Sequence, residues 1–202
     1  MLKAVIFWAL GLAVLLGGAL AVCPDGQCIV PGFDRSGLGL AHALRSAWLD
    51  ELMPAATWFG SLVLLLPLTG WVAWRLFRDG RRREAGFVTL ALLGASALGH
   101  LVKLGVARPR PDLFAWVAMP ESWSYPSSHA MQVTAVALAL ILVARRRRPV
   151  WIAPLLLVVL LVGASRVYLQ VHFPSDVIAG TLAAALWVGG LHTLFARRGG
   201  RG

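Results

Sequence analysis

Apolar residues along the chain gather into six long stretches, separated by segments that are rich in charge, glycine and proline. A hydrocarbon layer about 30 Å thick takes roughly 20 residues of helix to cross. Because backbone polar groups cannot stay unpaired in lipid, each stretch predicts a helix. The pattern therefore predicts an all-α fold, a bundle of six transmembrane helices. The predicted spans are residues 4–22, 52–74, 85–102, 130–144, 149–165 and 177–196.

The segment between the first two spans, residues 23–51, has a different pattern. In "FDRSGLGLAHALRSAWLDEL" apolar residues form a stripe beside charged positions. This pattern is typical of an amphipathic helix at a membrane surface. We expect one such helix, lying either on the outer leaflet or packed over the bundle. Its apolar stripe would consist of Leu38, Leu40, Ala43, Leu44, Ala47 and Trp48.

Composition supports a membrane protein, since 58% of the residues are hydrophobic and only 14% are charged. The net charge of +10 raises the question of nucleic acid binding, but the arginines cluster after the second, fourth and sixth spans. Cytoplasmic loops carry the excess of Lys and Arg, so this placement predicts an integral inner-membrane protein with both termini in the cytoplasm. It argues against a nucleic acid partner. The first apolar run also resembles a cleavable signal peptide, but its length favours a retained helix.

Two cysteines lie in the first outer loop, in the segment "CPDGQC". An oxidising compartment outside the cytoplasm would allow a disulfide around the Pro-Asp-Gly turn, and we expect this bond rather than two free thiols. The spacing fits neither a zinc knuckle nor a haem attachment site.

Three polar segments follow the outer ends of spans three to six: "KLGVARPRPD", "SYPSSHA" and "SRVYLQVHFPSD". Arginine forks match phosphate oxygens in pairs, and a lysine adds a point charge. Pro126 and Pro174 suit the first turns of two helices, whose free N–H groups would add an anion cradle. The loops therefore predict a phosphoryl site on the outer face, at the depth of lipid headgroups.

Two histidines and one carboxylate in these loops predict a reaction. Asp176 would lie about one helical turn from His172, near enough to accept its ring N–H. An imidazole oriented in this way can attack phosphorus, and His129 can protonate the leaving oxygen. The expected reaction is hydrolysis of a phosphate ester or anhydride through a phosphohistidine, with no metal or cofactor required.

The same segments resemble the type 2 phosphatidic acid phosphatase family, whose motifs read K-x6-R-P, P-S-G-H and S-R-x5-H-x3-D. Residues 103–111 and 165–176 match the first and third motifs at every defined position. The second motif has Ser128 where the family usually has glycine, and only a backbone N–H is needed there. The resemblance covers about the last two thirds of the chain.

Site residues follow from this resemblance, position by position. It implies that His172 is the nucleophile, that Asp176 is its partner and that His129 is the general acid. It implies phosphate ligands at Lys103, Arg110, Ser127, Ser128 and Arg166.

We expect a single domain, 1–202, in which 1–51 forms the first span and outer loop, 52–196 the catalytic bundle and 197–202 a basic tail. The expected substrate is an amphiphile, first undecaprenyl diphosphate, then phosphatidic acid or phosphatidylglycerophosphate. One alternative is a phosphotransferase that passes the phosphoryl group to another lipid. A second is a non-catalytic lipid-binding membrane protein. The sequence leaves the oligomeric state open.

Other polar and aromatic residues near the motifs are expected to have ordinary roles. Arg108 matches no motif position and is assigned to a lipid-headgroup contact, and His100 to core packing. Ser165 is expected to hold the loop or a neighbouring ligand. Three aromatic residues fit an interfacial belt: Trp116, Trp123 and Tyr125.

Overall fold

The computed structural model describes residues 1–144 and 149–196, and within these ranges the chain forms helices and no strands. The all-α prediction is therefore confirmed for the described residues. The predicted tail, 197–202, and the arginine cluster at 145–148 lie outside them. The elements are α1 (Leu2–Val22), η1 (Pro24–Gly26), α2 (Gly32–Ala43), α3 (Ala47–Thr57), η2 (Trp58–Gly60), α4 (Leu62–Arg78), α5 (Arg82–Val106), α6 (Ser128–Val143), α7 (Pro149–Tyr168) and α8 (Pro174–Ala196).

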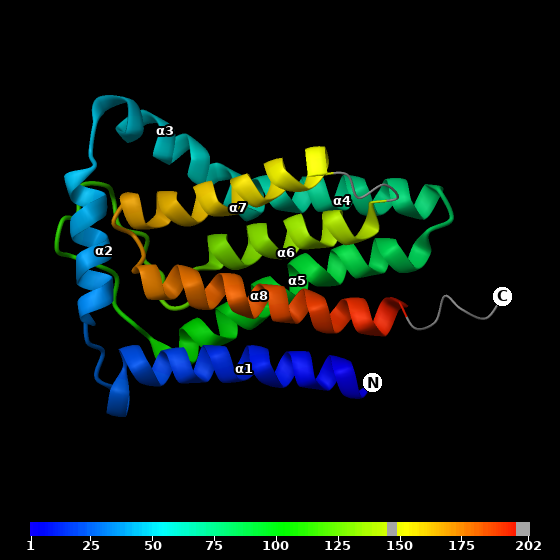
Figure 1. The fold of residues 1–202 in the computed structure, drawn as a ribbon, viewed down its shortest axis with the longest axis horizontal. Helices are drawn as coiled ribbons and strands as arrows, with labels where there is room; N and C mark the ends of the chain where they lie inside the picture. The colour runs from blue at the N-terminus through cyan, green and yellow to red at the C-terminus, as the bar shows by residue number, and fades with distance from the viewer. Residues whose placement is uncertain (145–148, 197–202) are drawn as a thin grey trace.

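Helices α1, α4, α5, α6, α7 and α8 run side by side along the long axis of the molecule (Figure 1). Helix α8 packs against α1, α5 and α6. Glycines make room for aromatic rings at two of these contacts, since a Cβ at Gly94 would meet Trp187 and one at Gly190 would meet Trp8. Small residues at such contacts allow membrane helices to approach closely.

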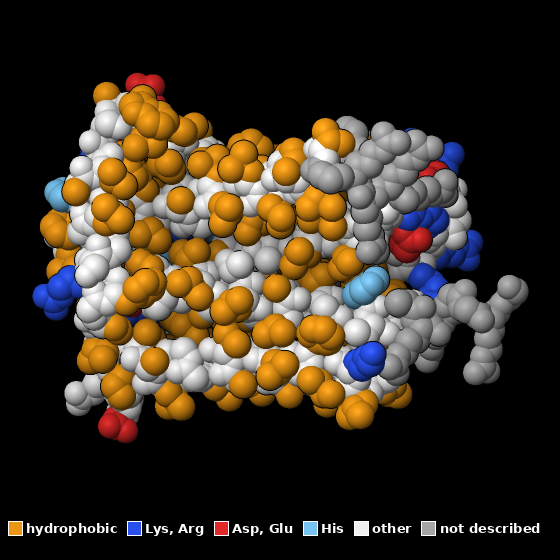
Figure 2. All heavy atoms as spheres, viewed as in Figure 1, with side chains coloured by type: hydrophobic (Ala, Val, Ile, Leu, Met, Phe, Trp, Pro, Cys, Tyr) orange, Lys and Arg blue, Asp and Glu red, His pale blue; other side chains and the backbone are white. Residues whose placement is uncertain are grey.

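Hydrophobic side chains cover the length of the bundle, while charged side chains lie toward its two ends (Figure 2). Among the described residues, α1, α5 and α8 are long and apolar enough to cross a membrane. The bent pair of α3–η2 and α4 raises this number to four, and α6 and α7 supply shorter apolar helices. The structure thus contains the predicted six-helix bundle, and the count of six spans remains a prediction.

The second predicted span, 52–74, is not one continuous helix. Helices α3 and α4 meet at a 44° bend around η2, and Ser61 caps α4 by accepting the Val63 N–H at 3.1 Å. Close packing accompanies the bend: a side chain at Gly60 would lie 2.7 Å from Val162 and 3.0 Å from His129. The bend therefore brings the second span against a predicted site residue.

The outer loop contains two helices, α2 and α3, where the sequence predicted one. Helix α2 stands across the end of the bundle (Figure 1), packed on α7 and α8. Its inner face buries Asp34 and Leu38, and Gly37 lies against Pro174. The alternative of a helix packed over the bundle is the one observed. The predicted stripe does not lie on one helix, because Leu38 and Leu40 belong to α2 whereas Ala47 and Trp48 belong to α3. Leu38 is buried, while Leu40 and Trp48 are exposed.

The two cysteines form the expected disulfide, with an S–S distance of 2.05 Å. It closes the turn between α1 and the segment that leads to α2. Just beyond it, the Ile29 N–H donates to the Val22 carbonyl at 2.8 Å, which fixes this segment on the end of α1.

Candidate active site

Three segments that carry the motifs meet at the end of the bundle that α2 crosses (Figure 1). They are the segment 107–127 between α5 and α6, the start of α6, and the turn between α7 and α8. These are the loops that the sequence predicted to converge. All the predicted site residues lie in them or in the adjoining helical turns.

The third motif folds around the start of α8. Pro174 is the first helical residue, as predicted, because its fixed φ suits that position. The Asp176 carboxylate turns back and accepts the Phe173 N–H at 3.0 Å through Oδ2. The same oxygen lies 3.4 Å from His172 Nδ1, so the predicted approach of carboxylate to imidazole is confirmed.

The tautomer of His172 follows from its neighbours. Arg110 Nη1 lies 3.3 Å from His172 Nε2, and a guanidinium can only donate. Nε2 therefore accepts, and the ring proton is on Nδ1, toward Asp176. Burial, followed by the nearby charges of Arg166, Arg110 and Lys103, lowers the pKa of His172 well below its ordinary value. The imidazole is thus neutral at neutral pH, with its lone pair on Nε2.

Ser124 is a site residue that the sequence reasoning missed. Its side chain is fully buried, its hydroxyl donates to Asp176 Oδ2, and its oxygen lies 3.4 Å from His172 Nδ1. It therefore links the carboxylate to the imidazole. The only signal in the sequence was its place beside the second motif, in "SYPSSHA", where nothing distinguished it from other loop serines.

The second motif begins differently from the prediction. Helix α6 starts at Ser128 with Ser127 as its N-cap, and Pro126 precedes the cap after a cis peptide bond. Placing Pro126 in the first turn was therefore wrong. The Ser127 N–H is not free for an anion either, because it donates to the Asp176 carbonyl at 3.1 Å. A side chain at Gly180 would block this approach of α6 and α8.

Tyr125 does not belong to an interfacial belt. Its side chain is fully buried, and its hydroxyl donates to the Leu15 carbonyl of α1 at 2.9 Å. A Cβ at Gly18 would lie 2.3 Å from that hydroxyl, so α1 approaches closely only because glycine stands there. Tyr125 thus ties the second motif to the first helix.

Three predicted phosphate ligands are held in place by neighbouring oxygens. Arg166 donates to Thr57 Oγ1 at 2.7 Å, and Lys103 donates to the Ser124 carbonyl at 3.1 Å. Arg110 donates to the Ser122 carbonyl at 2.7 Å. Burial lowers the pKa of Arg110 to about 10, so its guanidinium keeps its charge at neutral pH.

A cavity of about 350 Å³ opens beside these residues, with His129 and Arg166 among the residues that line it. Its wall includes Thr57 and Trp58 from the bent second span and Val171, the residue before His172. Among the predicted phosphate ligands in the described part of the chain, two buried polar atoms have no hydrogen-bond partner, Ser127 Oγ and Arg166 Nε. Each is a hydrogen-bond donor that a phosphate oxygen could accept from.

Arg108 is not a lipid-headgroup contact. It is 1% exposed and forms ion pairs with Asp34 and Asp176, so that assignment was wrong. The reason is that a buried guanidinium requires charged partners, which α2 and α8 supply.

Two further minor assignments also have clear outcomes. His100 is exposed, so its assignment to core packing was wrong. The Ser165 hydroxyl donates to the Val162 carbonyl in its own helix at 2.7 Å, so it holds neither the loop nor a ligand.

Comparison with known protein families identifies the family of this chain. Residues 84–199 match the sequence model of the PAP2 superfamily. The chain belongs to the PAP2 superfamily. This range contains all three motifs, from Lys103 to Asp176, and leaves α1 to α4 outside the match.

Similar proteins within the superfamily carry phosphatase names. Phosphatidylglycerophosphatase B of Bacillus subtilis is 35% identical over 149 residues, which span 69% of this chain and 72% of that protein. An undecaprenyl-diphosphatase of Sulfolobus acidocaldarius is 32% identical over 163 residues, covering 78% of this chain and 75% of the relative.

A solved structure of a PAP2 phosphatase has a similar fold. The crystal structure of the transmembrane PAP2 type phosphatidylglycerolphosphate phosphatase from Bacillus subtilis superposes with a TM-score of 0.78 at 26% identity, covering 98% of both chains. The PAP2 chain described here is therefore a membrane phosphatase that hydrolyses phosphate esters.

Proposed function

We propose that this PAP2 protein hydrolyses a lipid phosphate or diphosphate through a phosphohistidine formed on His172. The observation that carries the proposal is the placement of the imidazole, whose Nε2 lies 3.3 Å from Arg110 Nη1 while its Nδ1 lies 3.4 Å from Asp176 Oδ2. An imidazole that is oriented by a carboxylate on one nitrogen and faces a phosphate-binding arginine with the other is suited to in-line attack on phosphorus.

The reaction divides into two displacements. In the first, His172 Nε2 forms a bond to phosphorus, the bond from phosphorus to the leaving oxygen breaks, and His129 donates a proton to that oxygen. Burial and the charges of Arg166, Arg110 and Lys103 lower the pKa of His129 to about 3 in the free protein, so the negative charge of the bound phosphate must raise this pKa before His129 can carry the proton. In the second, His129 takes a proton from water, the water oxygen bonds to phosphorus, and the bond to Nε2 breaks. Asp176 stabilises the positive charge on the imidazole in between.

The phosphoryl group would be bound by cationic, hydroxyl and N–H donors around the nucleophile. Ser127 Oγ and Arg166 Nε support this, since both are buried without a partner among the described residues. Arg110 would move its Nη1 from Nε2 to a phosphate oxygen as the substrate enters. The proposed ligands are Lys103, Arg110, Ser127, Ser128 and Arg166.

Undecaprenyl diphosphate is the first candidate substrate, and phosphatidylglycerophosphate or phosphatidic acid is the second. The cavity beside His129 has mostly apolar walls, including Trp58, Val117 and Leu169, which suits an isoprenoid or acyl chain. The names of the two relatives correspond to the same two substrate classes.

We also propose a single domain that spans an inner membrane six times, with the site facing outward and both termini in the cytoplasm. Helix α1 begins and α8 ends away from the site (Figure 1). Arg75, Arg78 and Arg82 lie at the end of α4 or the start of α5, remote from the site loops, which supports this orientation.

The test is phosphate release by the purified protein from a panel of lipid phosphates and diphosphates, with and without a metal chelator. We expect release that the chelator leaves unchanged and that His172→Ala abolishes. His42→Ala is the matched control, since His42 is exposed at the same end of the molecule and stacks on Phe114. Normal turnover by His172→Ala would refute the proposal. Transfer of labelled phosphate to a second lipid, with no free phosphate, would favour the phosphotransferase.

A further inference from the structure

A buried ion-pair network lies behind the proposed nucleophile. Arg108 Nη2 is 2.8 Å from Asp34 Oδ2, and Arg108 Nη1 is 2.7 Å from Asp176 Oδ1. Each of the three side chains is at most 1% exposed. One guanidinium is therefore shared between a carboxylate of α2 and the carboxylate that faces His172.

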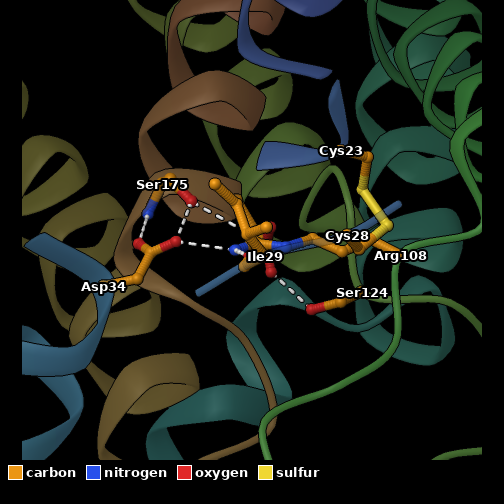
Figure 3. Close-up of a disulfide and its surroundings, with 8 residues drawn as sticks. Cys23, Cys28, Ile29, Asp34, Arg108, Ser124 and Ser175 are labelled. Atoms are coloured by element: carbon orange, nitrogen blue, oxygen red, sulfur yellow. Dashed lines mark hydrogen bonds and ion pairs between the residues drawn. A yellow bond between two sulfur atoms is a disulfide. The ribbon is translucent and has the colours of Figure 1, made fainter. Parts of the chain in front are cut away.

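Asp34 also binds the start of α8, although the two elements are far apart in sequence. Its Oδ1 accepts the Ser175 N–H at 2.9 Å, and its Oδ2 accepts the Ser175 hydroxyl at 2.7 Å (Figure 3). A carboxylate at this position satisfies a free N–H of the first turn and is favoured by the helix dipole. Asp34 thus caps α8 from a different helix.

The other contacts of Arg108 leave its guanidinium little freedom. The Arg108 Cζ atom lies 3.8 Å from the centroid of the Phe173 ring, and Arg108 Nη2 also donates to the Ile29 carbonyl at 3.2 Å. Ile29 follows the Cys23–Cys28 disulfide, and Figure 3 shows both together with Arg108. The outer loop therefore fixes the guanidinium in direction as well as in charge.

This arrangement assigns the two oxygens of Asp176 to different partners. Arg108 occupies Oδ1, which leaves Oδ2 for Ser124, for the Phe173 N–H and for His172 Nδ1. An arginine can serve two carboxylates at once because its nitrogens form a rigid fork. Without Asp34, all the attraction of a buried guanidinium would act on Asp176 alone and would draw Oδ2 away from the imidazole.

We propose that Asp34 and Arg108 are positioning residues that hold Asp176 against His172, so that α2 is a working part of the active site. Neither residue is one of the motif positions, and Asp34 lies outside the range that matches the superfamily. The proposal deepens the proposed function, on which its effect on turnover rests. The orientation and tautomer of His172 can be measured without a substrate.

The experiment uses the full chain labelled with ¹⁵N-histidine, and His172→Gln assigns the His172 signals. We expect the Nδ1–H tautomer in the unmodified protein and a mixture of tautomers in Asp34→Asn. Arg108→Lys is the second variant, because a lysine keeps the charge but lacks the fork. In both variants kcat should fall about 10- to 100-fold, as when a supporting partner of a site residue is removed.

Two comparisons separate positioning from a general structural role. Arg35→Gln, which removes an exposed charge of the same helix, should leave tautomer and kcat unchanged. Asp34→Asn should lower kcat no further in a protein that already carries Asp176→Asn, because the effects of coupled residues are not additive. A single Nδ1–H tautomer in folded Asp34→Asn, or additive losses in the double variant, would overturn the proposal. If the unmodified protein hydrolyses no lipid phosphate, the proposed function fails, and the spectra still decide the positioning.

Discussion

Replacing Ser124 by alanine would remove the hydroxyl that links Asp176 to His172. Ser124 is fully buried, and its hydroxyl donates to Asp176 Oδ2. Alanine is smaller by one oxygen and adds no new contact. The change therefore removes one hydrogen bond to a buried carboxylate and the contact of the same oxygen with His172 Nδ1.

The magnitude follows from the partners that Asp176 keeps. Arg108 Nη1 still donates at 2.7 Å and the Phe173 N–H at 3.0 Å, so the carboxylate is not left unpaired. A hydrogen bond to a charged group contributes about 1.5–3 kcal/mol, and with two donors remaining we take the lower end. About 1.5 kcal/mol corresponds to roughly a tenfold change in an equilibrium or a rate.

The assay has two readouts. Phosphate release should show kcat about tenfold lower, because the carboxylate and imidazole lose a shared anchor. Thermal unfolding should show a midpoint lower by about 3–6 °C for a chain of this size. Ser96→Ala is the matched control, since the Ser96 hydroxyl donates only to the Leu92 carbonyl of its own helix. Unchanged kcat and midpoint in Ser124→Ala would refute the assignment of Ser124 to the network.

Two further predictions concern the packing of α2 and the protonation of the nucleophile. A Cβ at Gly37 would lie 2.5 Å from Pro174 Cγ, so Gly37→Ala should displace α2 and lower kcat about tenfold. Gly39→Ala is the control, because a Cβ at Gly39 meets open space and should leave kcat unchanged. Equal rates in the two variants would contradict this packing argument. Because the pKa of His172 is lowered in the folded protein, the unfolded chain binds its proton first as the pH falls. The free energy of unfolding should therefore decrease below about pH 6.5, the ordinary histidine pKa, and His172→Gln should flatten that slope in denaturant titrations.

Much of the helical framework was predictable because hydropathy is a local property. Each apolar run that satisfies its own backbone hydrogen bonds becomes a helix whatever its neighbours are. The predicted helix start agrees at Pro174, the first residue of α8, but not at Pro126, which precedes the N-cap of α6. The prediction failed at 52–74, where close packing at Gly60 accompanies a bend that no local pattern announced.

Some contacts of the site were likewise predictable from the sequence, and others were not. His172 and Asp176 are four residues apart at a helix start, so their approach follows from helical geometry and was predictable. Arg108 and Asp34 are 74 residues apart, and neither lies in a periodic pattern that specifies a partner. Ser124 and Asp176, 52 residues apart, present the same difficulty.

The sequence by itself therefore determined most of the helices, the three motifs and the pairing of His172 with Asp176, because each depends on neighbours within one or two turns. The tertiary structure alone decided which polar residues are buried together: Asp34, Arg108 and Ser124 around Asp176. The physical reason is that a buried charge requires a partner, and only the packing of α2 across the end of α8 brings that partner within reach.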